Sequence, residues 1–240
     1  MDKILTYENK TIEICDCDYQ GHFRLNHLFN RFSQIATVDA KKRGLWNDDM
    51  YNHYGWVVSK QTLKLYSPIC VNDHIQLSTF IDNGTHVSFP RYYHIEKDGE
   101  IIGECSSVWT LIDIEKRRIV APKRIGIDVP KVHYVHDIEP PKTITTHLEM
   151  KYVCQRQVLY SDVDINQHMN NTRYIEWAFD ILDYHLHEKS YVEEISIHYK
   201  KEISPLTFVD LYLAIDNQRY IVEGRHDGII YFTMEIIFHS

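Results

Sequence analysis

The sequence predicts an α+β protein built from two copies of one unit, in which a long helix lies across a curved antiparallel sheet. A short polar motif occurs twice, from Asp18 to His22 and from Asp164 to His168, with Asp, an amide residue and His at alternate positions. A Ser-Pro landmark followed by Asp also occurs twice, at 67–73 and at 204–210. Two landmarks in the same order are typical of an internal repeat.

The first half reads as a strand, a long helix and an antiparallel meander. Apolar residues recur at helical spacing from Leu25 to Ala36, and Gly44 is a plausible helix stop. The pairs Asn83-Gly84 and Asp98-Gly99 are strong hairpin signals. The predicted elements are a strand at Thr11–Cys15, a helix at Phe23–Lys42 and strands at Trp56–Leu65, His74–Ile81, His86–Glu96 and Glu100–Asp113.

The second half repeats this order. Its helix carries Ile175, Ala178, Phe179 and Leu182 on one stripe, and Asp227-Gly228 supplies a hairpin turn. The predicted elements are a strand at Leu148–Leu159, a helix at Asn170–His187 and strands at Val192–Lys201, Thr207–Ile215, Arg219–Glu223 and Ile229–Phe238.

The connection between the halves is the proline-rich stretch Arg118–Lys142, which holds four of the seven prolines. We therefore divide the chain into a first unit at 1–120, a linker at 121–145 and a second unit at 146–240. Pairing the two sheets edge to edge would remove two exposed edges. Such a chain can close its sheet alone, so both a monomer and a homodimer are compatible with it.

Composition excludes several classes of protein. The formal net charge of −8 disfavours bulk nucleic-acid binding. Neither a signal-peptide core nor an apolar run long enough for a membrane span is found. The five cysteines lack a framework spacing, so we expect free thiols and a cytoplasmic location. The pair Cys15-x-Cys17, expected on one face of a strand, lacks further ligands nearby, as does His185-x-His187, so no metal or cofactor is predicted.

The second copy of the polar motif is the candidate chemical site. If its chain were extended, Asp164, Asn166 and His168 would point to the same side, because alternate residues of a strand do so. A carboxylate, an amide and an imidazole together suit holding a carbonyl and deprotonating a water. The alternative is an Asx-rich turn before a helix, with the histidine as a capping or core residue.

Three strings of the chain resemble the acyl-acyl carrier protein thioesterases, the plant plastid enzymes and their bacterial relatives. They are Asp162–Asn171 followed by Tyr174-Ile175, Ser107–Asp113 followed by Arg117-Arg118, and Tyr199–Glu202. The resemblance implies a tandem hotdog fold, hydrolysis of fatty acyl thioesters on acyl carrier protein, no cofactor, and an active site of Asp164, Asn166, His168 and Glu202.

The resemblance also contains a departure. Some plant members have a cysteine after the functional Glu, but Ile203 stands there in this chain. This difference favours direct attack by water over an acyl-enzyme. The general base would be Glu202 or His168, and the sequence does not choose between them.

The other roles follow from the side chains. Asp164 could fix either the imidazole tautomer or the Asn166 rotamer. Asn166 could donate to the thioester carbonyl or help to position the water. Free N–H groups at the start of a helix at Asn170 could stabilise the oxyanion. By the Ser-Pro landmark, Leu65 aligns with Glu202, so we expect one active site in the second unit and an acyl pocket shaped by the first.

Other functions remain open at this point. A hotdog acyl-coenzyme A thioesterase, a hydroxyacyl dehydratase and a catalytically silent acyl-binding protein would share most of these features. An acidic carrier protein would need a local basic patch. The candidates are Lys41–Arg43, Lys116–Arg118, Lys123-Arg124 and Lys200-Lys201.

Overall fold

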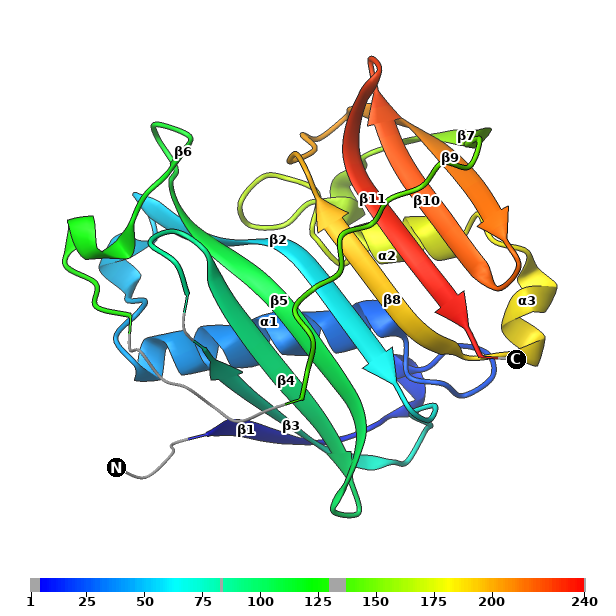
Figure 1. Ribbon diagram of the computed structural model, residues 1–240, viewed down its shortest axis with the longest axis horizontal. Helices are drawn as coiled ribbons and strands as arrows, with labels where there is room; N and C mark the ends of the chain where they lie inside the picture. Colours follow the sequence, from blue (N-terminus) through cyan, green and yellow to red (C-terminus); the bar gives the residue numbers. More distant parts are fainter. Residues whose placement is uncertain (1–4, 83, 130–136, 240) are drawn as a thin grey trace.

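One continuous antiparallel sheet forms the frame of the part of the chain that the structure describes. The computed structural model describes residues 5–82, 84–129 and 137–239. The strand order is β1-β3-β4-β5-β2-β8-β11-β10-β9-β7, and β6 pairs with β5 (Figure 1). The strands are β1 (Thr6–Thr11), β2 (Tyr54–Leu65), β3 (His74–Ile81), β4 (Phe89–Lys97), β5 (Glu100–Asp113), β6 (Arg118–Ile119), β7 (Lys151–Gln157), β8 (Val192–Tyr199), β9 (Phe208–Asp216), β10 (Arg219–His226) and β11 (Ile229–Phe238).

The two halves meet where β2 pairs with β8, from Lys60 opposite His198 to Lys64 opposite Glu194. Outward from this junction the strand order is the same on both sides, since β2-β5-β4-β3-β1 is matched by β8-β11-β10-β9-β7. Each half also places its helix after its edge strand in the chain. The expected α+β fold with two tandem units in one sheet is confirmed.

The helices differ between the halves. Helix α1 (Leu25–Lys42) is long, as expected, and lies across the strands of the first half (Figure 1). The single helix expected at Asn170–His187 is wrong, because the chain forms α2 (Arg173–Phe179) and α3 (Tyr184–Lys189). The break has a local cause: the Asp183 carboxylate accepts a hydrogen bond from the His185 N–H at 2.8 Å and so caps a new helix.

Two hairpins follow their sequence signals. Asp98 and Gly99, like Asp227 and Gly228, take positive φ angles, as a type I′ turn requires. Asn83 lies outside the described residues. The start of the chain was predicted wrongly: the strand is at Thr6–Thr11, and residues 14–16 form a 3-10 turn.

The second half has the same 3-10 turn before its motif, at Tyr160–Asp162. In both, an aspartate closes the turn: Asp16 accepts from the Glu13 N–H, and Asp162 accepts from the Leu159 N–H. The backbone groups of this segment therefore find partners without a strand neighbour.

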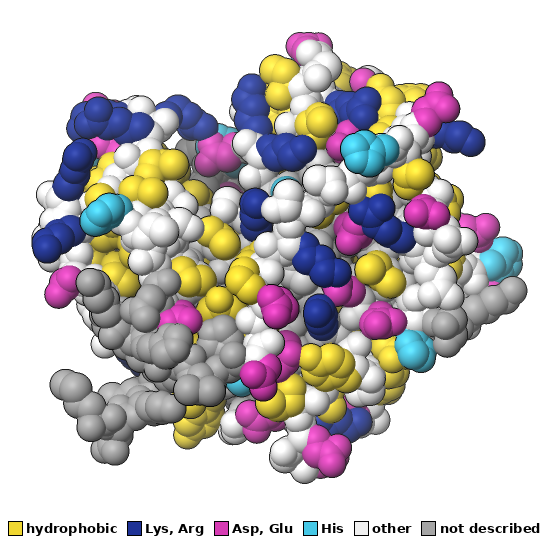
Figure 2. All heavy atoms as spheres, viewed as in Figure 1, with side chains coloured by type: hydrophobic (Ala, Val, Ile, Leu, Met, Phe, Trp, Pro, Cys, Tyr) yellow, Lys and Arg dark blue, Asp and Glu magenta, His cyan; other side chains and the backbone are white. Residues whose placement is uncertain are grey.

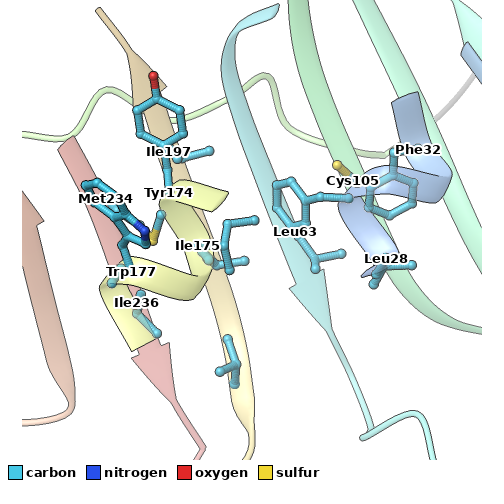
Figure 3. Packing of buried hydrophobic residues seen from close by; sticks show 14 of the residues in the cluster. Leu28, Phe32, Leu63, Cys105, Tyr174, Ile175, Trp177, Ile197, Met234 and Ile236 are labelled. Atoms are coloured by element: carbon cyan, nitrogen blue, oxygen red, sulfur yellow. The ribbon is translucent and has the colours of Figure 1, made fainter. Parts of the chain in front are cut away.

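The helices and the sheet enclose one main apolar cluster to which both halves contribute. Phe32, Leu63 and Cys105 of the first half and Ile175 and Trp177 of the second are buried in it (Figure 3). Burying such side chains supplies most of the driving force for folding. No helix of the described residues has the length and apolar character to cross a membrane.

The connector crosses the junction of the halves (Figure 1). Beyond the segment at 130–136, which lies outside the described residues, Lys142 binds both halves. Its main-chain N–H donates to Thr62 at 3.2 Å and its carbonyl contacts the His198 ring at 2.7 Å. Its ammonium also pairs with Glu194 at 2.5 Å. The connector therefore contacts both β2 and β8, the two strands that join the halves.

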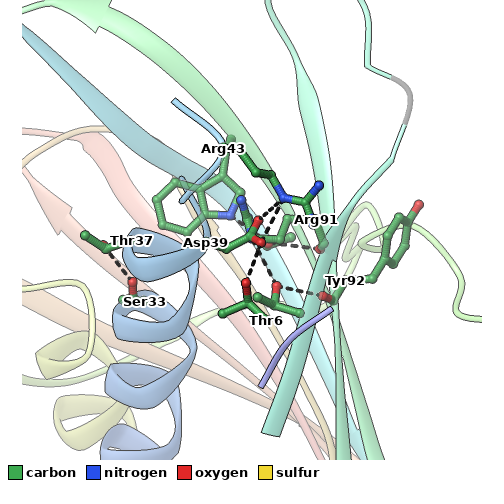
Figure 4. A network of polar contacts seen from close by, with 10 residues as sticks. Thr6, Ser33, Thr37, Asp39, Arg43, Arg91 and Tyr92 are labelled. Carbon is green, nitrogen blue, oxygen red and sulfur yellow. Dashed lines mark hydrogen bonds and ion pairs between the residues drawn. The ribbon is translucent and has the colours of Figure 1, made fainter. Parts of the chain in front are cut away.

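A buried charged network lies between α1 and the sheet. The Asp39 carboxylate accepts hydrogen bonds from Thr6, Arg43 and Arg91, each at 2.8 Å (Figure 4). Arg91 is only 4% exposed and also donates to Thr79. Because neither charge reaches water, each depends on the other for compensation.

We predict that Asp39→Leu lowers the free energy of unfolding by about 3–5 kcal/mol, since the Arg91 guanidinium is then buried without a carboxylate. The double variant Asp39→Leu/Arg91→Met should recover much of this loss because it removes both charges. Urea unfolding of the two variants and of the native chain measures the effect. A double variant no more stable than Asp39→Leu alone would contradict this account.

Candidate functional site

The loop that carries the candidate residues is a tight turn, and the expectation of an extended chain is wrong. The Asp164 N–H donates to the His168 carbonyl at 3.0 Å, and Val163 bridges Met169. Gln167 has a φ of 61°, an unfavourable conformation for a residue with a side chain. The turn, rather than strand alternation, determines where the side chains of this loop lie.

The loop places His168 beside Glu202. The His168 Nε2 and Glu202 Oε2 atoms are 3.5 Å apart, and both side chains are partly exposed. Glu202 follows the end of β8, and the Met169 N–H binds the carbonyl of the next residue, Ile203, at 2.8 Å. One main-chain hydrogen bond thus joins the loop to the chain segment that holds the carboxylate.

A third group contacts the same carboxylate. Arg117, in the turn after β5, donates to Glu202 Oε2. From the sequence, Arg117 was expected only as part of a basic cluster that could dock a carrier protein, although it also lies in one of the resembling strings. The three side chains link the first half of the protein to the loop of the second.

Asp164 acts on Asn166. Its Oδ1 atom accepts the Asn166 main-chain N–H at 2.8 Å, and its Oδ2 atom is 3.5 Å from the Asn166 Nδ2 atom. Within the described residues the Asp164 carboxylate has no bond to the His168 ring. Of the two roles considered for Asp164, the geometry therefore favours orientation of the Asn166 amide.

The expected oxyanion donors at a helix starting at Asn170 are not there. The helix begins at Arg173, and Asn170 itself accepts from the Thr172 and Arg173 N–H groups at 2.9 Å. The His168 main-chain N–H, by contrast, has no acceptor among the described residues. It and the Asn166 side-chain amide are two of the donors that this loop can offer to a ligand.

Tyr174 lies near Glu202 and Asp164 and was not predicted as part of the site. It is buried, and burial together with the nearby Glu202 charge raises the pKa of its phenol. A neutral hydroxyl at this position adds no further charge beside Glu202. Tyr174 is part of the string that carries the family resemblance, which is the signal that could have identified it.

The cysteines have no place in this site. Ile203, which stands where a thiol was considered, is fully buried. The five cysteines are free and lie at other positions. Burial raises the pKa of the Cys17, Cys70 and Cys105 thiols, which keeps them protonated and poorly nucleophilic.

An apolar cavity borders the loop. It has a volume of about 260 Å³ and lies in the first half, between the C-terminal part of α1 and strands β2 to β5. Ile165 and Asn166 are the two residues of the second half that line it. The other lining residues are Ala36, Thr37, Ala40, Leu45, Trp46, Tyr51, Trp56, Ile81, Phe89, Arg91 and Trp109.

The first copy of the motif folds almost bond for bond like the second. The Asp18 N–H donates to the His22 carbonyl at 2.8 Å, and Asp18 Oδ1 accepts the Gln20 N–H at 2.9 Å. Gly21 takes the positive φ that Gln167 has in the second copy. The repeat predicted from Asp18, Gln20 and His22 therefore holds at the level of main-chain hydrogen bonds.

The first copy has Pro68 where the second has Glu202, so the expected match with Leu65 is wrong. The Phe23 N–H binds the Ile69 carbonyl as the Met169 N–H binds that of Ile203. The residue before Ile69 is Pro68. The Ser-Pro landmark misaligned the halves because the dipeptide precedes the carbonyl of this hydrogen bond in the first half and follows it in the second.

A cluster of side chains that could ligate a metal lies near the start of the chain. Ligand atoms of Glu13, Cys15 and Asp16 lie within 4.8 Å of one another. The site is open to solvent, and the Lys10 ammonium already binds Asp16 at 2.7 Å. Cys17 turns into the core, so the two cysteines do not face one way as was expected.

Comparisons with known proteins identify the family of the chain. Family models described as the N-terminal and C-terminal domains of acyl-ACP thioesterase match residues 4–125 and 145–232. A chloroplastic palmitoyl-acyl carrier protein thioesterase of Cuphea hookeriana is 24% identical over 234 residues. That match covers 90% of this chain but 56% of the plant protein, so the chain spans little more than half the length of this relative.

Two solved structures share the fold. An acyl-ACP thioesterase from Bacteroides thetaiotaomicron superimposes with a TM-score of 0.83 and 21% identity, covering 98% of both chains. The 12:0-ACP thioesterase from Umbellularia californica gives a TM-score of 0.80 at 15% identity, covering 100% of this chain and 98% of that one. With family models matching both halves, the chain belongs to the acyl-acyl carrier protein thioesterase family.

Proposed function

We propose that this protein hydrolyses the thioester between a fatty acyl chain and acyl carrier protein, releasing the free fatty acid. The observation that carries the proposal is the 3.5 Å distance between His168 and Glu202. In the same loop as His168, the residues Ile165 and Asn166 line an apolar cavity. Membership of the thioesterase family supports it. An acid–base pair next to an apolar cavity suits the cleavage of an acyl bond.

The reaction needs a nucleophilic water and a site for negative charge on the carbonyl oxygen. Glu202 or His168 takes a proton from water, whose oxygen attacks the thioester carbon. The Asn166 amide, oriented by Asp164, donates to the developing oxyanion. When the carbon–sulfur bond breaks, the proton passes to the departing thiolate, and fatty acid and carrier thiol leave.

The two halves would divide the work. The second unit, 146–240, supplies the candidate catalytic residues, and the first unit, 1–120, supplies the apolar cavity for the acyl chain, with 121–145 as linker. Arg91 stands in the cavity wall with Asp39 behind it, which closes the apolar space with a buried ion pair. The five free thiols favour a reducing compartment, so we place the activity in the cytoplasm.

A thiol-release assay with acyl carrier protein and coenzyme A substrates of several chain lengths tests the function. We expect the higher kcat/KM with the carrier-linked substrates. A preference for coenzyme A substrates would instead identify an acyl-coenzyme A thioesterase. Binding of acyl thioesters without thiol release would identify a silent acyl-binding protein.

We predict that Glu202→Gln and His168→Ala each lower kcat by about 10²–10⁴-fold, because each removes a group able to accept the proton from water. Rates across pH, measured by thiol release, show which variant loses the pH dependence of the native chain. The matched control is Glu193→Gln, since Glu193 on β8 also lies 3.5 Å from a histidine, His239, but at an exposed position. Near-normal turnover by both site variants would refute the assignment.

We predict that Asn166→Ala lowers kcat by about 10²–10³-fold with little change in KM, as expected for the loss of a donor used in the transition state. Asp164→Asn should have a smaller effect in the same direction, because it weakens the support of the Asn166 amide. Steady-state kinetics separate kcat from KM. An increase in KM alone would show that Asn166 only binds substrate.

Carrier docking would use the exposed cations around Glu202. Lys200 and Lys201 precede it in the chain, and Arg118 follows its partner Arg117. Figure 2 shows Lys and Arg side chains gathered over the end of the molecule where β6 lies. The cluster at Lys41–Arg43 is less suited, because Arg43 is bound to the buried Asp39.

We predict that salt raises the KM for acyl carrier protein substrates several-fold while that of an uncharged acyl-pantetheine thioester stays nearly constant. Surface charges attract an acidic carrier over about a Debye length, which shrinks as salt is added. Parallel titrations with both substrates measure the difference. An equal response of the two substrates would exclude electrostatic docking.

A further inference from the structure

A second cavity, larger than the first, lies between the first copy of the motif and the helices of the second half. Its volume is about 410 Å³, within the ~300–1,000 Å³ typical of small-molecule sites. Its apolar wall includes Leu25, Ile69, Ile175, Trp177, Phe179 and Phe238. Asp18, His22 and Pro68 of the first half also line it. The proposed reaction uses none of these residues.

This cavity and the candidate acyl cavity each lie beside one copy of the motif loop. There, a loop of the second half borders a space bounded by the helix and strands of the first. Here, the equivalent loop of the first half borders a space bounded by α2 and by residues of β8 and β11. Since the two loops share their main-chain hydrogen bonds, the duplication has placed a loop of the same shape beside each cavity.

The second cavity lacks the carboxylate that the proposed reaction needs. Pro68 occupies the position of Glu202, and among the described residues no acidic side chain forms an ion pair with His22. The cavity can therefore hold an acyl chain beside an imidazole without the pair of groups that would activate water.

Most of the charged groups at this cavity are paired with one another. Three guanidinium groups and four carboxylates line it. Arg156 binds Asp180 at 2.6 Å, and Arg173 pairs with Glu176 and Asp162.

The two remaining charged residues differ in what they can offer. The Asp18 carboxylate accepts loop N–H groups at 2.9 Å and 3.0 Å. Arg24 is exposed and uses its Nε atom to bind the Cys17 carbonyl, but it forms no ion pair within the described residues. Its terminal N–H groups are those that suit a carboxylate.

We propose that this cavity is a second, non-hydrolytic site that binds a free fatty acid, with the alkyl chain against the Ile175 and Trp177 wall and the carboxylate on Arg24. The choice of ligand rests on the proposed function, which produces such an acid. The fatty acid would bind both cavities, but only the cavity beside His168 and Glu202 would cleave a thioester.

Calorimetric titration with dodecanoate, kept below its micelle concentration, tests the proposal. The native chain should bind two molecules. Ala40→Phe, which fills the cavity of the first half, should leave one, and Ser190→Phe, which fills the second cavity, should also leave one. Adding Arg24→Gln to Ala40→Phe should weaken the remaining site about tenfold, as the loss of a charge-assisted hydrogen bond implies.

The control for the Arg24 change is Lys42→Gln in the Ala40→Phe background, which removes the same charge from the other end of α1 and should leave the affinity unaltered. A single site in the native chain that Ala40→Phe abolishes would overturn the proposal while leaving the proposed hydrolysis intact. Dodecanoate bound by Ala40→Phe and weakened by Arg24→Gln would support the second site even if thiol release were absent, which separates the two proposals.

Discussion

The Met169 N–H bond to the Ile203 carbonyl is the contact on which the candidate site depends. It joins the loop after β7 to the residues after β8, which brings His168 to within 3.5 Å of Glu202. Both segments are irregular, and two side chains on free loops would lose conformational entropy on meeting. Because the Met169–Ile203 hydrogen bond already joins the two segments, folding meets most of that entropy cost. The His168 and Glu202 side chains are therefore positioned before a substrate binds.

The junction of β2 and β8 has the same importance for the cavities. It continues one sheet across both halves, so that each loop lies over the helix and strands of the other half. Neither cavity is complete within one unit, since Ile165 and Asn166 border the first and Asp18 and His22 border the second. The duplication therefore places a cavity beside each copy of the loop.

Divergence then made the two spaces different. Glu202 and Arg117 form an ion pair at one loop, whereas Pro68 stands at the equivalent position of the other. The second helix is also broken at Asp183, while α1 runs for 18 residues. Two equal active sites would each need a carboxylate at the position of Glu202. Because Pro68 stands at that position in the first half, the loop and the apolar walls there can bind a ligand but lack the group for hydrolysis.

The sequence by itself determined the duplication, the order of elements and the family, because periodicity, hairpin pairs such as Asp98-Gly99 and the string at 162–171 are local signals. It placed Glu202 in the site only through the resemblance. The tertiary structure decided that the motif is a turn and that Asp164 binds Asn166. It also decided that Arg117 binds Glu202, and that Pro68 is the equivalent of Glu202 in the first half. These depend on main-chain bonds between segments far apart in the chain, such as Met169 with Ile203, which no local pattern encodes.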